Sequence, residues 1–133
     1  MQPAPILVVE DDEDIRRFAV AVLEDAGYRV LTARDAVEAF VELERNPTIS
    51  LMFTDVVMPR IDGLMLADMA RLRLPGLRVL YATGYFDQVQ RQPGYRYGAT
   101  LAKPYRRGQL EAAVRQCLAE PPRLHIPKHA PDA

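Results

Sequence analysis

The sequence lacks several features that whole classes of protein require. Its single cysteine excludes an internal disulfide and fits a reducing compartment. No apolar run approaches the roughly 20 residues that a membrane-spanning helix needs. The formal net charge of −1 provides no overall field that would attract nucleic acid or an anionic membrane. The first residues lack a basic region followed by a long apolar stretch, so we expect no signal peptide and a cytoplasmic protein.

Hydrophobic segments are plentiful, and they follow two different periods. The chain has 133 residues, of which 49% are hydrophobic, so it is long enough for one domain with a real core. Short apolar runs predict strands, and segments with apolar residues at helical spacing separate them. The expected strands are 6–9, 28–33, 49–54, 77–82 and 99–102. This alternation implies a flavodoxin-like, doubly wound α/β domain, with a five-stranded parallel sheet and helices on both faces.

Capping residues mark where the first two helices of this pattern begin. Asp12 is the expected N-cap of the first helix, with Asp14 favourably placed in its first turn. Asp35 precedes the second helix, and Glu38 resembles the partner residue of a capping box. Two further helices are expected at 64–72 and 110–118.

Two stretches depart from this regular pattern. Residues 86–92 could form a helix, but Pro93-Gly94 ends it at once, so we expect a short or irregular fourth helix. From Pro121-Pro122 onward the chain is rich in proline and poor in large apolar residues. We therefore expect a domain over residues 5–119 and a flexible tail over residues 120–133.

Polar side chains follow four of the predicted strands. Glu10 and Asp11 follow the first strand, Asp55 the third, Thr83 the fourth and Lys103 the fifth. The carboxyl ends of parallel strands meet at one edge of the sheet, where ligands bind in open α/β folds. Converging carboxylates repel one another, and a hard divalent cation such as Mg²⁺ would relieve that repulsion. The set suits phosphoryl transfer to Asp55, with a metal, a cationic side chain and a hydroxyl donor beside it.

Taken singly, each of these residues has a simpler explanation. An acid after a strand is more often a turn or capping residue than a nucleophile, and Thr83-Gly84 is an ordinary start of a turn. What favours a site is their joint placement at the ends of four separate strands.

At these positions the chain resembles the receiver domain of two-component response regulators, over about residues 5–119. The resemblance implies that Asp55 is the phosphoryl acceptor and that Glu10 and Asp11 are the acidic pair of a Mg²⁺ site. Asp55 and the backbone carbonyl of Val57 would complete the protein's metal ligands, which leaves Asp12 with its capping role. The motifs that carry the resemblance are Leu7–Asp12, Asp55–Pro59, Asp62-Gly63, Ala82–Gly84 and Lys103-Pro104.

The resemblance also assigns the residues of the other two strand ends. Thr83 resembles the switch hydroxyl and Lys103 the lysine of the family pattern, with a cis Lys103–Pro104 bond expected. Thr100 is a departure, because receivers often carry an aromatic switch residue at that position. Tyr81 and Tyr85 are the candidates to take over that role. The segment around Thr83 resembles a receiver subgroup, many of whose members are single-domain proteins.

The function expected from this resemblance is signalling rather than turnover. A histidine kinase or a histidine phosphotransfer protein would phosphorylate Asp55, and the altered surface would bind a downstream protein; no nucleic-acid or membrane partner is expected. The chain contains no output domain, so it could also be a phosphorelay intermediate or the receiver module of a hybrid kinase. A phosphohydrolase is less compatible, because such enzymes usually carry a second acid where this chain has Val57. A pseudo-receiver scaffold would not need the intact set of acids.

The remaining reactive or charged residues predict no further site. Cys117 lies on the apolar stripe of the last helix and is expected to be buried. His125 and His129 lie in the tail without further ligands spaced for a metal. We expect three methionines, Met58, Met65 and Met69, in the core, and scattered arginines, Arg71, Arg73, Arg78, Arg106 and Arg107, on solvated faces.

Overall fold

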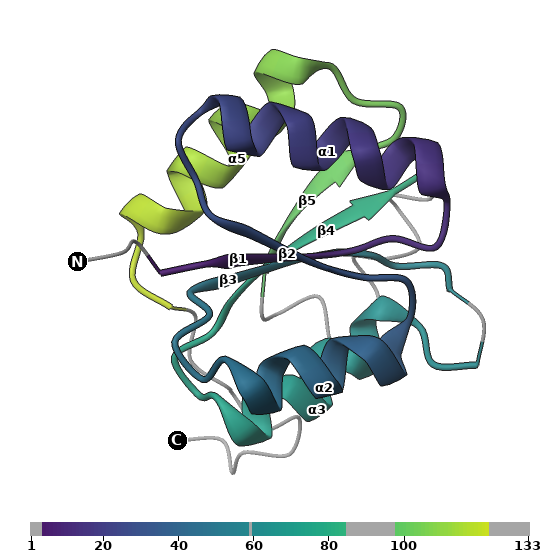
Figure 1. Cartoon of the computed structure of the whole chain (residues 1–133), viewed down its shortest axis with the longest axis vertical. Coiled ribbons are helices and arrows are strands. Elements are labelled where there is room, and N and C mark those ends of the chain that lie inside the picture. The colour runs from purple at the N-terminus through teal and green to yellow at the C-terminus, as the bar shows by residue number, and fades with distance from the viewer. Residues whose placement is uncertain (1–3, 59, 85–97, 123–133) are drawn as a thin grey trace, which may run out of the picture.

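A parallel sheet lies between two layers of helices in the computed structural model, which describes residues 4–58, 60–84 and 98–122 (Figure 1). The strand order is β2-β1-β3-β4-β5, and every neighbouring pair is parallel. The strands are β1 (Ile6–Val9), β2 (Val30–Ala33), β3 (Leu51–Asp55), β4 (Arg78–Thr83) and β5 (Gly98–Ala102). The predicted five-stranded, doubly wound sheet is confirmed.

Within the described ranges, two helices cover each face of the sheet. Helices α1 (Glu13–Asp25) and α5 (Arg107–Ala119) lie on one face, above the sheet in Figure 1. Helices α2 (Ala36–Arg45) and α3 (Gly63–Arg73) lie on the other face, below it. The buried side chains accordingly form two apolar clusters, one on each side of the sheet.

The central strands are apolar throughout because both of their faces are covered. Every residue of β1 and β3 is buried, whereas β2 at the edge of the sheet is only partly so. The strand order reverses between β1 and β3, since the chain moves outward from β1 to β2 and then returns past β1 to β3. Ligand sites in doubly wound folds lie beside such a reversal, at the carboxyl ends of the strands.

Aspartates cap α1, α2 and α3 at this edge of the sheet, whereas the N-cap of α5 is Arg106. The side chain of Asp12 accepts a hydrogen bond from the amide of Ile15 at 3.0 Å, as predicted. Asp62 caps α3 in the same way. The box expected at α2 is altered, because Glu38 accepts a hydrogen bond from the amide of Arg34 rather than from the N-cap Asp35. These caps fix where each helix leaves the loop that carries the polar side chains.

Strand β2 begins at Val30, two residues later than predicted. Gly27 has a φ of 94°, and the amide of Tyr28 donates to the carbonyl of Leu23 at 3.1 Å. The first residues of the predicted strand therefore complete the end of α1.

The exposed face of α3 differs from the prediction. Met58 is buried as expected, but Met65 and Met69 are 53% and 40% exposed. Arg71, expected in solvent, is buried, and its guanidinium donates to the carbonyl of Leu77 at 2.6 Å. Apolar residues occur on every side of this helix, so their spacing could not identify the face that packs on the sheet.

Other predictions have mixed outcomes. The Lys103–Pro104 bond is cis, as expected. Cys117 is half-buried rather than buried. None of the helices in the described ranges has the length and apolar character that a membrane span requires. The predictions for Tyr85, for the short fourth helix over 86–97, and for the tail with His125 and His129 lie outside the described residues.

Candidate functional site

Strand register brings the predicted site residues to one edge of the sheet. Val9 of β1 pairs with Thr54 of β3, so the residues that follow them, Glu10 and Asp55, emerge side by side. Asp55 is the last residue of β3, rather than the first residue after it as predicted. Lys103 follows the end of β5 directly.

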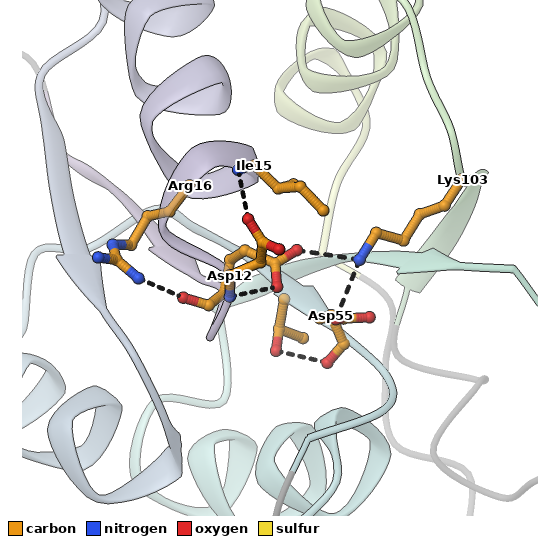
Figure 2. A network of polar contacts seen from close by, with 7 residues as sticks. Asp12, Ile15, Arg16, Asp55 and Lys103 are labelled. Carbon is orange, nitrogen blue, oxygen red and sulfur yellow. Dashed lines mark hydrogen bonds and ion pairs between the residues drawn. The ribbon is translucent and has the colours of Figure 1, made fainter.

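One amine joins the acids from the two central strands. Lys103 Nζ lies 3.0 Å from Glu10 Oε1 and 3.0 Å from Asp55 Oδ2. Figure 2 shows its side chain reaching across from β5, with dashed lines to both carboxylates. The cationic side chain expected beside Asp55 therefore pairs with both Asp55 and Glu10.

Three carboxylates form a single cluster. One oxygen of each of Glu10, Asp11 and Asp55 lies within 4.8 Å of the others. Glu10 and Asp55 are 4% and 8% exposed, whereas Asp11 faces solvent. Asp11 is therefore the acid that an ion arriving from solvent meets first.

Glu10 is held by local hydrogen bonds (Figure 2). Its Oε2 accepts from the amide of Asp12 at 3.1 Å, and its main-chain carbonyl accepts from Arg16 Nη1 at 2.9 Å. Both donors belong to the cap or first turns of α1. The start of α1 therefore fixes the orientation of this buried acid.

The cluster carries more negative charge than its partner lysine balances. Burial raises the pKa of Glu10 from 4.5 to about 7, against the opposing hydrogen bonds from Lys103 and the Asp12 amide, and the charge of Asp55 adds to the shift. Burial alone would lower the pKa of Lys103, but hydrogen bonds and charges from Glu10 and Asp55 raise it above its usual value. The lysine thus stays charged, whereas the negative form of Glu10 is disfavoured, first by burial and then by the charge of Asp55.

This set of donors fits a hard divalent cation. The candidate ligands are all oxygens, two from buried acids and one from an exposed acid, and such ligands favour Mg²⁺ over softer metals. A cation would also offset the negative charge of Asp55, which adds to the effect of burial on the pKa of Glu10. Val57 follows β3, and its side chain is 59% exposed at this edge; the role of its carbonyl stays a prediction.

The family model described as "Response regulator receiver domain" matches residues 6–115. The chain belongs to this receiver family. The receiver protein CpdR of Brucella abortus (strain 2308) is 38% identical over 116 residues, which cover 85% of this chain and 95% of CpdR. Receivers of two-component systems generally bind Mg²⁺ at an acidic pocket, and the cluster of Glu10, Asp11 and Asp55 is the corresponding feature here.

Solved receiver structures share this fold. The receiver of the hybrid histidine kinase CckA is 37% identical with a TM-score of 0.74, and the match covers 86% of this chain and 98% of that one. The chemotaxis protein CheY4 of Vibrio cholerae is 26% identical with a TM-score of 0.79, at coverages of 86% and 98%. A histidine kinase is accordingly the kind of upstream partner that this receiver implies.

Thr83 lies beside the lysine of this receiver. It is the last residue of β4 and is 1% exposed. Its main-chain carbonyl accepts a hydrogen bond from the amide of Lys103 at 3.0 Å. This main-chain hydrogen bond therefore holds Thr83 and Lys103, the predicted hydroxyl donor and amine, next to each other.

Sequence reasoning missed two residues next to the site. The hydroxyl of Thr54 donates to the carbonyl of Asp55 at 3.0 Å. The ring of Tyr105 lies 5.7 Å from that of Phe53 and 6.1 Å from that of Phe18. Burial raises the pKa of Tyr105, and the charges of Glu10 and Asp55 add to the effect. The position of Tyr105 directly after Lys103-Pro104 was a signal that could have found it; Thr54 gave none.

Proposed function

We propose that Asp55 accepts a phosphoryl group from a histidine kinase or a histidine phosphotransfer protein in a Mg²⁺-dependent reaction. The observation that carries the proposal is the convergence of two further acids and one lysine on the acid that ends β3. Glu10, Asp11, Asp55 and the main-chain carbonyl of Val57 would hold the Mg²⁺. When bound, the ion neutralises charge on the phosphoryl oxygens.

The chain's own residues supply the remaining steps of the transfer. A carboxylate oxygen of Asp55 forms the new bond to phosphorus while the bond from phosphorus to the histidine nitrogen breaks. That nitrogen keeps the electron pair of the broken bond, and because the other ring nitrogen of the phosphohistidine carries a proton, the histidine leaves as neutral imidazole. Lys103 Nζ, which lies 3.0 Å from Asp55 Oδ2, is placed to donate to the developing charge on the phosphoryl group. The Thr83 hydroxyl would bind a second phosphoryl oxygen and report the modification.

An apolar hollow next to the site is the proposed contact for the phosphodonor. It has a volume of about 230 Å³ and lies between the start of α1 and the segment that follows β5. Phe18, which is 40% exposed, and Tyr105 contribute aromatic surface there, and Lys103 connects the hollow to Asp55. A helical partner that presents a histidine side chain fits this surface. The remaining lining residues are Asp14, Ile15 and Pro104.

The proposed output is binding to another protein, with residues 5–119 as the receiver and residues 120–133 as a separate tail. A phosphorelay role, or a receiver module of a hybrid kinase, is the second candidate, and the similarity to the CckA receiver favours it. Turnover of external substrates is not part of the proposal, because exposed Val57 offers no acid or base near Asp55.

The direct test is phosphorylation by a small donor. The protein is incubated with acetyl phosphate and Mg²⁺, and bound phosphoryl groups are counted by intact-protein mass spectrometry. We expect one acid-stable, hydroxylamine-sensitive phosphoryl group on the parent protein and none on Asp55→Asn. The matched control is Asp62→Asn, which changes an acid that caps α3 and should be labelled like the parent.

Three results would contradict the proposal. Labelling of Asp55→Asn would place the acceptor elsewhere, and no labelling of the parent would leave only a scaffold function. Continuous release of phosphate far beyond one equivalent would make the protein a phosphohydrolase.

A further inference from the structure

Helix α3 begins in direct contact with the main chain of Asp55. Its first residue is Gly63. A Cβ atom added there would lie 2.1 Å from the carbonyl oxygen of Asp55 and 3.0 Å from its carbonyl carbon. It would also lie 3.0 Å from Cα of Val56. Side chains do not approach backbone atoms at 2.1 Å, so any larger residue must separate the helix from the strand.

Backbone conformation does not explain this glycine. Gly27 is the described glycine with a positive φ, at 94°, and Gly63 has no such φ. Another residue could therefore adopt the same backbone angles. The position needs a residue without a Cβ atom, because the peptide that follows Asp55 occupies the space that a Cβ would fill.

Three hydrogen bonds hold the main chain of Asp55 and Val56 in place. The amide of Gly63 donates to the carbonyl of Val56 at 2.8 Å, and the amide of Val56 donates to the carbonyl of Ala82 in β4 at 3.1 Å. The Thr54 hydroxyl donates to the carbonyl of Asp55 at 3.0 Å. The main chain at Asp55 is therefore fixed between β4 on one side and the first turn of α3 on the other.

We propose that Gly63 and the Thr54 hydroxyl are positioning residues, which set the place of the Asp55 carboxylate relative to Glu10, Asp11 and Lys103. Neither touches the reacting atoms; both act through the carbonyl of Asp55. The part of the proposal that concerns phosphorylation rests on the function proposed above. The part that concerns Mg²⁺ binding does not need it.

The expected effect follows from the size of the clash. Relief of the contact needs a movement of about 1 Å, and a misplacement of that size can cost about 100-fold in rate. The carboxylate oxygens of the cluster lie within 4.8 Å of one another, so a movement of that size changes the ligand geometry substantially. Mg²⁺ demands near-ideal octahedral geometry, which makes its affinity sensitive to such a change.

The chain offers a matched control at the opposite edge of the sheet. Gly98 begins β5, and a Cβ added there would lie 2.0 Å from the carbonyl oxygen of Val79. This contact is as tight as that of Gly63, and it also involves a strand of the same sheet. Val79 pairs with Met52, at the far end of β3 from Asp55.

The first experiment compares Gly63→Ala with Gly98→Ala in the full chain. Urea unfolding should show a loss of stability in both variants. Titration with Mg²⁺, followed through backbone amide shifts, should show at least about tenfold weaker binding in Gly63→Ala and unchanged binding in Gly98→Ala. Phosphorylation by acetyl phosphate at saturating Mg²⁺ should slow by about 10- to 100-fold only in Gly63→Ala.

A second pair of variants covers the case in which Gly63→Ala does not fold. Thr54→Val keeps the volume of a fully buried side chain but removes its hydroxyl, and Thr54→Ser keeps the hydroxyl. We expect about threefold weaker Mg²⁺ binding in Thr54→Val and near-parent binding in Thr54→Ser. If Thr54 only filled space in the core, Mg²⁺ affinity would not depend on whether the substituted side chain keeps the hydroxyl.

Two results would overturn the proposal. One is a Mg²⁺ affinity in Gly63→Ala that equals that of the parent or falls equally in Gly98→Ala. The other, decisive where Gly63→Ala is unfolded, is equal Mg²⁺ affinity in Thr54→Val and Thr54→Ser. If the parent protein accepts no phosphoryl group, the proposed function fails, and the Mg²⁺ titrations still decide the positioning role.

Discussion

The polar groups at the amino ends of the strands (the amino edge of the sheet) and those at the carboxyl ends (the carboxyl edge) are paired to different extents. At the amino edge, main-chain groups satisfy one another: the amide of Ser50 donates to the carbonyl of Pro5 at 3.0 Å, and the amide of Arg78 donates to the carbonyl of Ser50 at 3.2 Å. At the carboxyl edge, two buried acids share one lysine. In the described part of the chain, the acids at the carboxyl edge outnumber their one lysine partner, and the proposed Mg²⁺ would supply the missing positive charge.

This difference indicates that the charged groups at the carboxyl edge lower the stability of the folded domain. Buried charge is costly unless it is paired, and three acids with a single lysine are incompletely paired. Substitutions of charged residues should therefore change the free energy of unfolding strongly at the carboxyl edge and weakly at the amino edge. At the carboxyl edge, some of these substitutions should stabilise the protein rather than destabilise it.

The largest difference is expected between Lys103→Met and Arg78→Met. Lys103→Met leaves two buried carboxylates unpaired, which should lower the free energy of unfolding by about 3 kcal/mol. It should also slow phosphorylation of Asp55 about 100-fold. Arg78 donates to the carbonyl of Glu120 at an exposed site, so Arg78→Met should cost less than about 1 kcal/mol. Urea unfolding and acetyl phosphate labelling measure both effects; similar losses in the two variants would remove the contrast between the edges.

The pH dependence of stability should be dominated by the carboxyl edge. The pKa of Glu10 is raised to about 7 in the folded protein, so folding favours its protonated form. The resulting stability is fully present below about pH 4.5 and is lost as the pH rises through 7. Without Mg²⁺, this loss should be roughly 2–3 kcal/mol between those values.

Urea unfolding across this range, with Glu10→Gln as the comparison, measures the contribution of Glu10. The variant should lack the decline, and Mg²⁺ should reduce it in the parent protein. A parent and a variant with parallel pH profiles would show that Glu10 does not titrate in this range.

Removal of an unpaired charge should stabilise the carboxyl edge. Asp11 belongs to the acid cluster but has no ion pair with Lys103 among the described contacts. Asp11→Asn should therefore raise the free energy of unfolding by roughly 1 kcal/mol in the absence of Mg²⁺, because like charges at about 4 Å interact by that amount in water. The same change should abolish the added stability that Mg²⁺ provides. Glu120→Gln at the amino edge is the control, and it should change neither quantity; a destabilised Asp11→Asn would contradict the argument from repulsion.

The smallest effect is expected at the mouth of the site. Val57 is 59% exposed, and its side chain has no polar atom that could orient a water molecule near Asp55. Val57→Asn should hasten loss of the phosphoryl group about threefold, because its amide can hold such a water. The control is Val41→Asn on α2, where the valine is 43% exposed. Decay followed by mass spectrometry after removal of the donor should be unchanged in Val41→Asn; an equal half-life in all three proteins would show that water access at Val57 does not limit decay.

Most of the site could be predicted because it lies at the ends of buried strands. Apolar runs without alternation identified β1 and β3, and the residues that follow parallel strands must share an edge. Glu10, Asp55 and Lys103 therefore came together as expected. Their roles in phosphoryl transfer came from the resemblance to receivers.

The features that sequence reasoning missed depend on packing distances between elements. Nothing in the order of residues shows that Gly63 lies against the carbonyl of Asp55, because that depends on how closely α3 approaches β3. The burial of Arg71 likewise depends on the turn that brings the carbonyl of Leu77 to its guanidinium. Met65 and Met69 were misplaced because apolar residues surround α3, and only tertiary contacts decide which side is covered.

The two separate apolar clusters have a consequence for how such a domain can diversify. The sheet acts as a partition, because side chains under α1 and α5 do not pack against those under α2 and α3. Substitutions on opposite sides should then combine with little epistasis. The layer that carries Phe18 and Tyr105 could drift toward a new upstream partner without compensating changes in the opposite layer. After gene duplication, one copy could change its upstream partner through substitutions in one helical layer and its downstream partner through separate substitutions in the other.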